Sequence, residues 1–385
     1  MKSRIYLDHA ATTPVHPAVL AAMIPYFTDD GYNPSSQHVE GRRARAGLDE
    51  ARDAAASALG VSRKELIFTG SGSEADNQAI LGVARSNWSA RGRHVVSTAI
   101  EHHAVLHALD ALAAEGFEIT LLPVDERGLV DPERFARALR DDTVLASVVY
   151  ANNEIGVVQP IAELAAAARR RGVLFHTDAV QAAGWLPIAP RELGVDLMAL
   201  SAHKFYGPQG VGALYVREGV VVPPLIHGGG QEFGRRSGTE NVAGIVGLAT
   251  ALERVVLGRA ARAGRAAALR DRLEAGLIER IADLRVNGRE AARLPNNCNV
   301  SFAGIDSETI LMRLDLEGVA VSAGSACTSG ALEPSHVIAA LNVDPRWQQG
   351  VIRFSLGEGT SEEEVDRVLE LLPRITEHLR GRATL

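Results

Sequence analysis

From residue 65 the chain alternates between short apolar runs and stretches with the period of an α-helix. Such runs are typical of strands buried on both faces, and the helical stretches at 74–90, 103–115 and 132–140 are typical of covering helices. This repetition predicts βαβ units and a mainly parallel sheet, which places the chain in the α/β class. Seven runs form the sheet that we expect: "ELIFT", "RHVVST", "FEITLLPV", "TVLASVVY", "GVLFHTD", "VDLMALSA" and "GVGALYV".

The C-terminal part of the chain has a different pattern. Residues 246–282 are rich in Ala, Leu and Arg and predict one long helix. After it come the strand-like runs "NCNVSF", "GVAVSAG" and "VIRFSLG", which indicate a smaller α+β unit. A chain of 385 residues exceeds the usual size of a single core. We therefore predict a large cofactor-binding domain at 14–258 and a small domain formed by 1–13 and 259–385.

Composition limits the classes of partner. The formal net charge of -7 argues against direct nucleic-acid binding, because such proteins present a concentrated positive surface. The N-terminus lacks the apolar core of a signal peptide, and no segment has about eighteen uninterrupted apolar residues, so we expect no membrane association and a cytoplasmic location. The two cysteines, Cys298 and Cys327, are expected to be free thiols in a reducing compartment.

Lysine is scarce in this chain. Only Lys2, Lys64 and Lys204 occur among 40 basic Lys and Arg residues. Lys204 follows the strand "DLMALSA", and ligands of parallel sheets gather at the carboxyl ends of strands. Lysine can form an imine with a carbonyl compound, whereas arginine cannot. Lys204 is therefore a candidate catalytic residue, with Ser201 and His203 beside it as candidate phosphate ligands; a salt-bridged structural lysine is the alternative.

Asp178 ends the apolar run "GVLFHTD", and Gln181 follows it. An aspartate in this position can keep a pyridine nitrogen protonated, which pyridoxal phosphate requires to act as an electron sink. Gln181 can then bind the phenolic oxygen of the ring. The alternative is that Asp178 only caps the next helix.

The segment "TGSGSEADN", residues 69–77, joins a strand to a helix. Gly72 allows a tight turn and Ser73 lies in the first helical turn, where free N–H groups and the helix dipole favour a phosphate. Alternatively, Ser73 and Asp76 form an N-cap arrangement that needs no ligand. The absence of a GKS or GKT sequence argues against a nucleoside triphosphate loop.

The segment "EHHAVLH" contributes three histidines. His103 and His107 have metal-ligand spacing on a helix, but no clear third ligand accompanies them, so we predict no metal site. His102 fits better as an imidazole stacked on a cofactor ring. In "VIRFSLG", alternation places Arg353 on the face opposite Ile352, where it can bind a carboxylate; an exposed arginine is the alternative.

Taken in order, the chain resembles the pyridoxal-phosphate cysteine desulfurases of the NifS/IscS-like class with a long cysteine-bearing loop, on the class V aminotransferase fold. The resemblance covers nearly the whole chain and is jointly specific. It rests on "YLDHAATTP", "GYNPSSQH", "TGSGSEADN", "EHHAV", "NNEIGVVQP", "HTDAVQ", "SAHKFYGPQGVGALY", "GGGQEFGRRSGTEN", "SAGSACTS" and "IRFSLG".

The resemblance implies a role for each matching residue. Lys204 would carry the cofactor, Asp178 would pair with the pyridine nitrogen, and His102 would stack on the ring and assist acid–base steps. This chain has Gly72-Ser73 where the family usually has Ala-Thr, which keeps the hydroxyl. The resemblance further implies that Gln181 would contact the phenolic oxygen and that Asn153 would lie beside the cofactor. Arg353 and Asn33 would bind the carboxylate of cysteine. The phosphate would be bound by Gly72, Ser73, Ser201 and His203, and by Thr239 from the partner subunit of a homodimer.

The resemblance also explains Cys327, which lies on a Gly- and Ser-rich stretch. The family removes sulfur from L-cysteine through a pyridoxal-phosphate ketimine, which yields L-alanine and a persulfide on this cysteine. Sulfur acceptors would be iron-sulfur cluster scaffolds or tRNA thiolation enzymes. Two alternatives remain: another enzyme of the same fold, such as an aminotransferase or selenocysteine lyase, and a sulfur-trafficking or scaffold protein that uses Cys327 alone.

Overall fold

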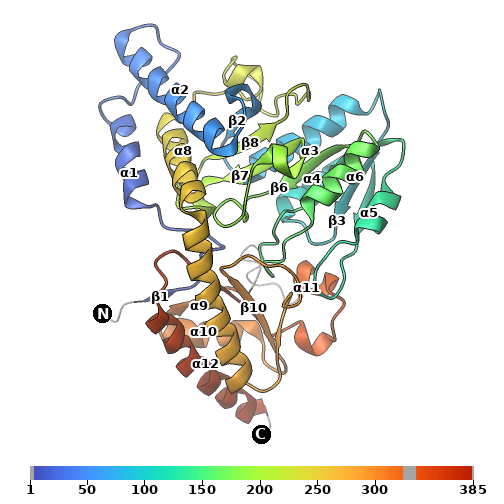
Figure 1. Cartoon of the computed structure of the whole chain (residues 1–385), viewed down its shortest axis with the longest axis vertical. Coiled ribbons are helices and arrows are strands. Elements are labelled where there is room, and N and C mark those ends of the chain that lie inside the picture. The colour runs from blue at the N-terminus through green and yellow to red at the C-terminus, as the bar shows by residue number, and fades with distance from the viewer. Residues whose placement is uncertain (1–3, 324–334, 384–385) are drawn as a thin grey trace.

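The computed structural model describes residues 4–323 and 335–383 and contains a seven-stranded sheet in the order β2-β8-β7-β6-β5-β3-β4 (Figure 1). β3 to β7 are mutually parallel, and β8 is antiparallel to both β7 and β2. The predicted α/β class and mainly parallel sheet are confirmed. The strands are β2 (Leu66–Thr69), β3 (His94–Thr98), β4 (Glu118–Leu122), β5 (Thr143–Ser147), β6 (Leu174–Asp178), β7 (Leu197–Ser201) and β8 (Gly212–Val216).

Helices cover both faces of this sheet. Neighbouring strand residues alternate between two apolar clusters: Leu145 belongs to the cluster under α3 and α4, and Ala146 belongs to the cluster under α2, α6 and α8. Burial on both faces explains why the strands are continuous apolar runs. The helices of this layer are α1 (Pro17–Met23), α2 (Val39–Leu59), α3 (Gly72–Asn87), α4 (His103–Ala114), α5 (Pro132–Ala138), α6 (Ile161–Arg170), α7 (Pro190–Leu193) and α8 (Val242–Leu257).

The long helix expected at 246–282 is two helices, α8 and α9 (Arg259–Arg280), which meet at Gly258. The expectation of one unbroken helix was wrong because glycine is a poor helix former and here serves as C-cap of α8 and N-cap of α9. α9 leads from the seven-stranded sheet into the C-terminal part of the chain (Figure 1).

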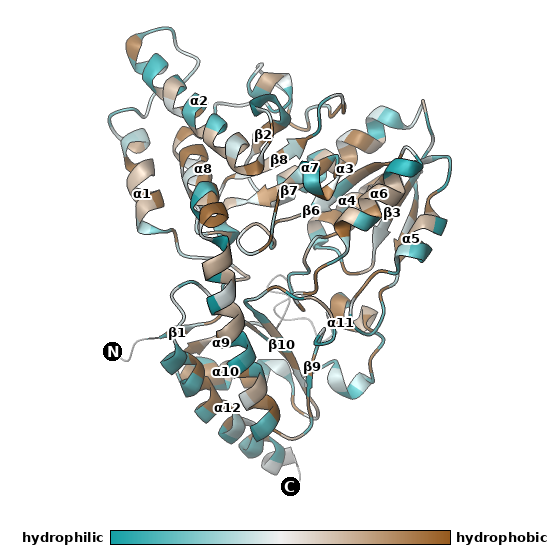
Figure 2. Ribbon diagram, in the orientation of Figure 1, coloured by the Kyte–Doolittle hydropathy of each residue, from teal (hydrophilic) through white to brown (hydrophobic). Residues whose placement is uncertain are grey.

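The C-terminal part has its own apolar cluster, which includes Leu7 of the N-terminal segment. β1 (Ile5–Tyr6) pairs in parallel with β11 (Val319–Ala320). The helices α2 and α12 carry hydrophilic and hydrophobic residues in alternation, as helices with one face on a core do (Figure 2). The exact bounds of the two domains stay a prediction. The remaining elements are β9 (Leu284–Val286), β10 (Asn297–Phe302), β12 (Val351–Ser355), α10 (Ser307–Leu316), α11 (His336–Ala340) and α12 (Glu362–Ala383).

Candidate active site

A pocket of about 300 Å³ lies at the carboxyl ends of β6 and β7 and receives residues from distant parts of the chain. This is the sheet edge at which the sequence placed the ligand. Side chains from α3, α4, β6, β12 and α11 meet there, together with the N-terminal segment. Ten residues predicted from the sequence line the pocket: Gly72, Ser73, His102, Asn153, Asp178, Gln181, Ser201, His203, Lys204 and Arg353.

The N-terminus of α3 forms one wall of the pocket. Ser71 is its N-cap, and its hydroxyl accepts a hydrogen bond of 3.1 Å from the N–H of Glu74. The cap at Ser73 that the sequence suggested as an alternative is therefore wrong, and Ser73 lies inside the first turn facing the pocket. A Cβ on Gly72 would come within 2.8 Å of a methyl group of Val180, so the backbone approaches the pocket closely here. This wall offers free N–H groups to an anion.

Lys204 ends η3 (Ala202–Lys204), the short 3₁₀ turn that follows β7. Its amine donates hydrogen bonds to the carbonyls of Ala10 at 2.7 Å and Ala11 at 2.8 Å. The amide of Gln181 donates to the same Ala10 carbonyl at 2.9 Å. The N-terminal segment therefore holds both side chains at one side of the pocket, although it is about 170 to 190 residues away in the chain.

His203 also faces the pocket. Its Nδ1 lies 3.1 Å from the hydroxyl of Thr12. Burial, helped by the positive charge of Lys204, lowers the pKa of His203 to about 4. At neutral pH His203 is an uncharged hydrogen-bonding group next to the amine.

Asp178 is the last residue of β6 and is only 5% exposed. One carboxylate oxygen accepts a hydrogen bond of 2.8 Å from the N–H of Val180. Burial raises the pKa of Asp178, and this effect outweighs the opposing influence of His102, the Val180 bond and Lys204. A buried carboxyl of this kind gains a partner if a protonated ring nitrogen is placed against it.

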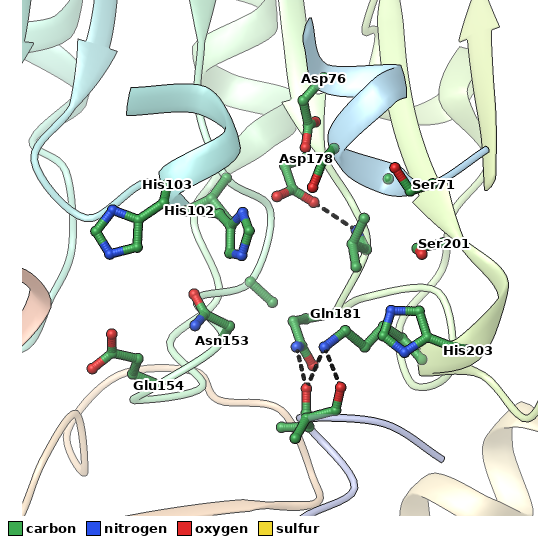
Figure 3. A pocket seen from close by; sticks show the side chains of 18 of the residues that line it. Ser71, Asp76, His102, His103, Asn153, Glu154, Asp178, Gln181, Ser201 and His203 are labelled. Carbon is green, nitrogen blue, oxygen red and sulfur yellow. Dashed lines mark hydrogen bonds between the residues drawn. The ribbon is translucent and has the colours of Figure 1, made fainter. Parts of the chain in front are cut away.

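His102 is the N-cap of α4, and its Nδ1 accepts a hydrogen bond of 3.1 Å from the N–H of Ala104. Its pKa is lowered mainly by burial, to which Lys204, His103 and His336 add. Nδ1 is an acceptor, so the neutral ring has its proton on Nε2. His102 and Asp178 lie close together on the same side of the pocket (Figure 3).

Arg353 reaches the pocket from β12. Ile352, Phe354 and Leu356 are fully buried in the C-terminal cluster, so the predicted alternation of this strand is confirmed. The Arg353 guanidinium, only 2% exposed, pairs with Asp8 at 2.7 Å and donates to the carbonyl of Asn153 at 2.8 Å. A buried guanidinium at the edge of a pocket suits a carboxylate ligand.

The class V aminotransferase family matches residues 5–368. The cysteine desulfurase IscS of Dictyoglomus turgidum is 50% identical over 99% of this chain and 96% of its own. A solved structure titled "NIFS-LIKE PROTEIN" superposes with a TM-score of 0.92, 39% identity and coverage of 98% of this chain and 100% of that one. Another, titled "SspA in complex with cysteine", has a TM-score of 0.81, 35% identity and coverage of 91% and 98%.

The chain belongs to the class V aminotransferase family. Its full-length similarity to IscS and NifS-like proteins supports a cysteine desulfurase that depends on pyridoxal phosphate. The resemblance identified from the sequence is thereby confirmed.

The pocket of this class V protein fits pyridoxal phosphate. The amine of Lys204 and the buried carboxyl of Asp178 line one pocket, and the uncapped N–H groups of α3 lie beside the hydroxyls of Ser73 and Ser201. These groups match an aldehyde, a ring nitrogen and a phosphate, respectively. Across residues 4–323 and 335–383, no three or more His, Cys, Asp or Glu side chains are arranged to hold a metal ion.

Two of the predicted site residues that the structure describes do not line this pocket. Asn33 is exposed, and its side-chain oxygen accepts from the N–H of Ser35 at 2.9 Å. Thr239 is also exposed and does not line the pocket of its own chain. Cys327 lies outside the described residues. Cys298 is a buried free thiol, and burial raises its pKa to about 12, as expected for a structural cysteine.

The sequence reading missed several pocket residues. Glu154 and His336 line the pocket, but the sequence analysis gave them no role. Glu154 lies inside the motif "NNEIGVVQP", and His336 lies nine residues after Cys327. The His336 ring packs against His103, and the two ring centroids are 4.7 Å apart. The sequence analysis considered Asp76 only as part of an N-cap arrangement, whereas this residue lines the pocket from the second turn of α3.

Proposed function

We propose that this chain is a cysteine desulfurase that converts L-cysteine to L-alanine and a persulfide on Cys327. The observation that carries the proposal is the convergence of the Lys204 amine, the Asp178 carboxyl and the Arg353 guanidinium on one pocket. An amino acid bound by its carboxylate at Arg353 places its amine toward the same cavity as Lys204. A solved relative described in complex with cysteine supports the choice of substrate.

The roles of the individual residues are part of the proposal. Asp178 would keep the pyridine nitrogen protonated, Gln181 would bind the phenolic oxygen, and Asn153 and His102 would lie beside the ring. When bound, the cofactor withdraws electrons from the carbon that bears the amine of the substrate. Lys204 would form the imine with the cofactor and move protons once it is released. The phosphate would be held by Gly72, Ser73, Ser201 and His203.

Arg353 would hold the carboxylate of the substrate. Its contacts with Asp8 and the carbonyl of Asn153 fix the plane of the guanidinium from two sides, which pre-orients it for a bidentate ligand. Asn33, the second predicted carboxylate ligand, is retained in this proposal as a contact made when substrate binds.

The described residues on either side of Cys327 support its assignment as the sulfur carrier. Ser322 exchanges backbone hydrogen bonds with Arg353, at 2.7 and 3.3 Å. The hydroxyl of Ser335 donates to Glu154 at 2.5 Å. Arg353 and Glu154 both line the pocket, so the segment that contains Cys327 begins and ends beside it.

In the proposed step the Cys327 thiolate attacks the sulfur of the substrate. An S–S bond forms, the Cβ–S bond breaks, and the electron pair of the broken bond stays on the carbon, which takes a proton and leaves as alanine. The persulfide sulfur then passes to an acceptor, an iron-sulfur cluster scaffold or a tRNA thiolation enzyme. Only the thiolate is nucleophilic enough for this attack.

The proposal includes a homodimer in the cytoplasm. Thr239 would complete the phosphate site of the partner subunit, in accord with its exposure on its own chain. A series of large apolar side chains is exposed along α1, η1 (Ile24–Phe27) and the start of α2, as expected for a surface that a second subunit covers. These side chains are Leu20, Ile24, Phe27, Tyr32 and Val39. No described helix combines the length and the apolar character needed to span a membrane.

The test is an assay of alanine and sulfide from L-cysteine with a thiol reductant, for the wild type, Cys327→Ala and Lys204→Ala. We expect a yellow wild type that forms both products and two variants that form neither. Full cysteine turnover by Cys327→Ala would instead indicate a transaminase or lyase of the same fold. Alanine formation by Lys204→Ala would exclude the proposed use of this lysine.

A further inference from the structure

Two buried carboxyl groups lie near each other in the lining of the pocket. Asp76 on α3 and Asp178 on β6 are neighbours there, and the carboxyl group of Asp76 points toward Asp178 (Figure 3). Both line the pocket, and the two residues are only 1% and 5% exposed. Asp178 has a role in the proposed function, whereas nothing so far accounts for a second buried acid at its side.

No cation among the described residues compensates Asp76. Its nearest basic group is His176, whose Nε2 is 3.5 Å from the Asp76 Oδ1, and neither atom has a hydrogen-bond partner in the described part of the chain. His176 is fully buried, its Nδ1 lies 2.9 Å from the Ser147 hydroxyl, and burial lowers its pKa to about 3. The imidazole is therefore neutral. The other acid near Asp76 is Glu101, which is also fully buried.

Two adjacent carboxylates that are buried this deeply do not both ionise, because each would raise the electrostatic energy of the other. Asp178 has partners that favour its ionised form, namely the Val180 N–H and the positive charge of Lys204. Asp76 has none of these, and burial beside Asp178 and Glu101 raises its pKa well above the ordinary value. The proton therefore belongs on Asp76.

We propose that Asp76 is a positioning residue that stays protonated and directs its acid proton to Asp178, so that the pair has a single negative charge facing the cofactor nitrogen. The inference rests on the proposed function, since it assigns the cofactor's ring to this end of the pocket. One charge on the pair matches one positive charge on a protonated ring nitrogen, and a second charge would be left without a partner.

The test compares Asp76→Asn with Asp76→Leu. Asparagine is uncharged and keeps a hydrogen-bond donor, whereas leucine has the same branching at Cγ, a larger volume and no donor. The dissociation constant of pyridoxal phosphate and the visible spectrum of the bound cofactor are measured without cysteine. We expect Asp76→Asn to remain within about threefold of the wild type and Asp76→Leu to bind the cofactor at least tenfold more weakly, which corresponds to about 1.4 kcal/mol.

Two results would overturn the inference. If Asp76→Asn loses as much affinity as Asp76→Leu, an ionised Asp76 is required; if Asp76→Leu binds like the wild type, Asp76 has no part in positioning Asp178. Thermal unfolding of the cofactor-free proteins separates a folding defect from a binding defect, and Asp76→Ala replaces the leucine variant if that variant does not fold. A wild type that takes up no pyridoxal phosphate would refute the proposed function itself.

Discussion

Glu101 is a further acid whose ionisation conflicts with the folded structure. It is fully buried, and one oxygen accepts hydrogen bonds from the Thr98 hydroxyl at 2.6 Å and the Val149 N–H at 3.0 Å. Its other oxygen has no partner among the described residues. Burial, supported by the charge of Asp178, raises the pKa of Glu101 to about 8. The folded chain therefore keeps this side chain neutral at pH 7.

This shift predicts how stability depends on pH. The unfolded chain releases the Glu101 proton near pH 4.5, whereas the folded chain retains it until about pH 8. The free energy of unfolding therefore decreases as pH rises between these two values, and this loss of stability is constant above about pH 8. We expect Glu101→Gln, which is neutral throughout, to be close to the wild type at pH 5 and more stable at pH 8, by on the order of 3 kcal/mol.

Urea unfolding of both proteins at pH 5 and pH 8 measures this difference. A Glu101→Gln variant whose advantage is the same at the two pH values would show that Glu101 ionises normally in the folded chain.

Among the elements, β8 determines where α3 begins. Gly212, the first residue of β8, pairs with Thr69 on one side and Ser201 on the other. A Cβ at this position would come within 2.5 Å of the backbone of Ser71 and 2.7 Å of the Leu200 carbonyl. Backbone atoms held in a sheet have little room to move. The bare backbone of Gly212 is therefore what allows the N-terminus of α3 to approach the sheet and face the pocket.

We expect Gly212→Ala to lower the free energy of unfolding by about 2–3 kcal/mol and to weaken cofactor binding, because the alanine displaces the N-cap of α3. The matched control is Gly264→Ala on α9, where a Cβ meets nothing within 4 Å. An exposed helical glycine replaced by alanine should gain about 0.5–1 kcal/mol and leave cofactor affinity unchanged. Equal effects of the two variants on cofactor affinity would contradict this role of Gly212.

At the scale of the whole molecule, several separate parts of the chain form the site. The seven-stranded sheet provides Asp178 and Lys204, β12 provides Arg353, and the N-terminal segment provides the carbonyls that hold Lys204. α11 packs its apolar side chains against the loops of the large sheet, where Val337 and Ile338 share a cluster with Ile100. Relative movement of the two parts would therefore change the distance between substrate carboxylate and cofactor.

The proposed dimer predicts complementation between two defective variants. Lys204→Ala cannot form the imine, and Thr239→Ala removes a phosphate contact from its partner's site. In a mixed dimer one site has an intact Lys204 and receives an intact Thr239 from the other subunit. Random reassortment of equal amounts should restore up to about a quarter of the wild-type alanine formation.

Each variant assayed alone is the baseline for this experiment. The absence of any gain after co-refolding, or a wild type that sediments as a monomer, would contradict the contribution of Thr239 in trans.

Local patterns in the sequence were enough to predict several features of this protein. Six of the seven strands were found because their residues are buried on both faces, so that consecutive positions are apolar. The exception is the edge strand β4, which is partly exposed. Asp178 and Lys204 were found because the first ends such a run and the second lies three residues after the end of β7. The family resemblance added Asn153, which lines the pocket although its role stays a prediction.

Other features were decided only by the tertiary structure. The cap of α3 at Ser71 depends on where β8 allows the helix to begin. The contacts of Lys204 with Ala10 and of Arg353 with Asp8 join residues 194 and 345 positions apart.

The sequence by itself therefore determined which residue types end the strands, since burial and periodicity are properties of neighbouring positions. Which of these residues meet was decided by the packing of sheet, N-terminal segment and β12. The pair Asp76 and Asp178 is the clearest case: both residues are present in the sequence, but only the fold buries them next to each other, and that environment determines their charge.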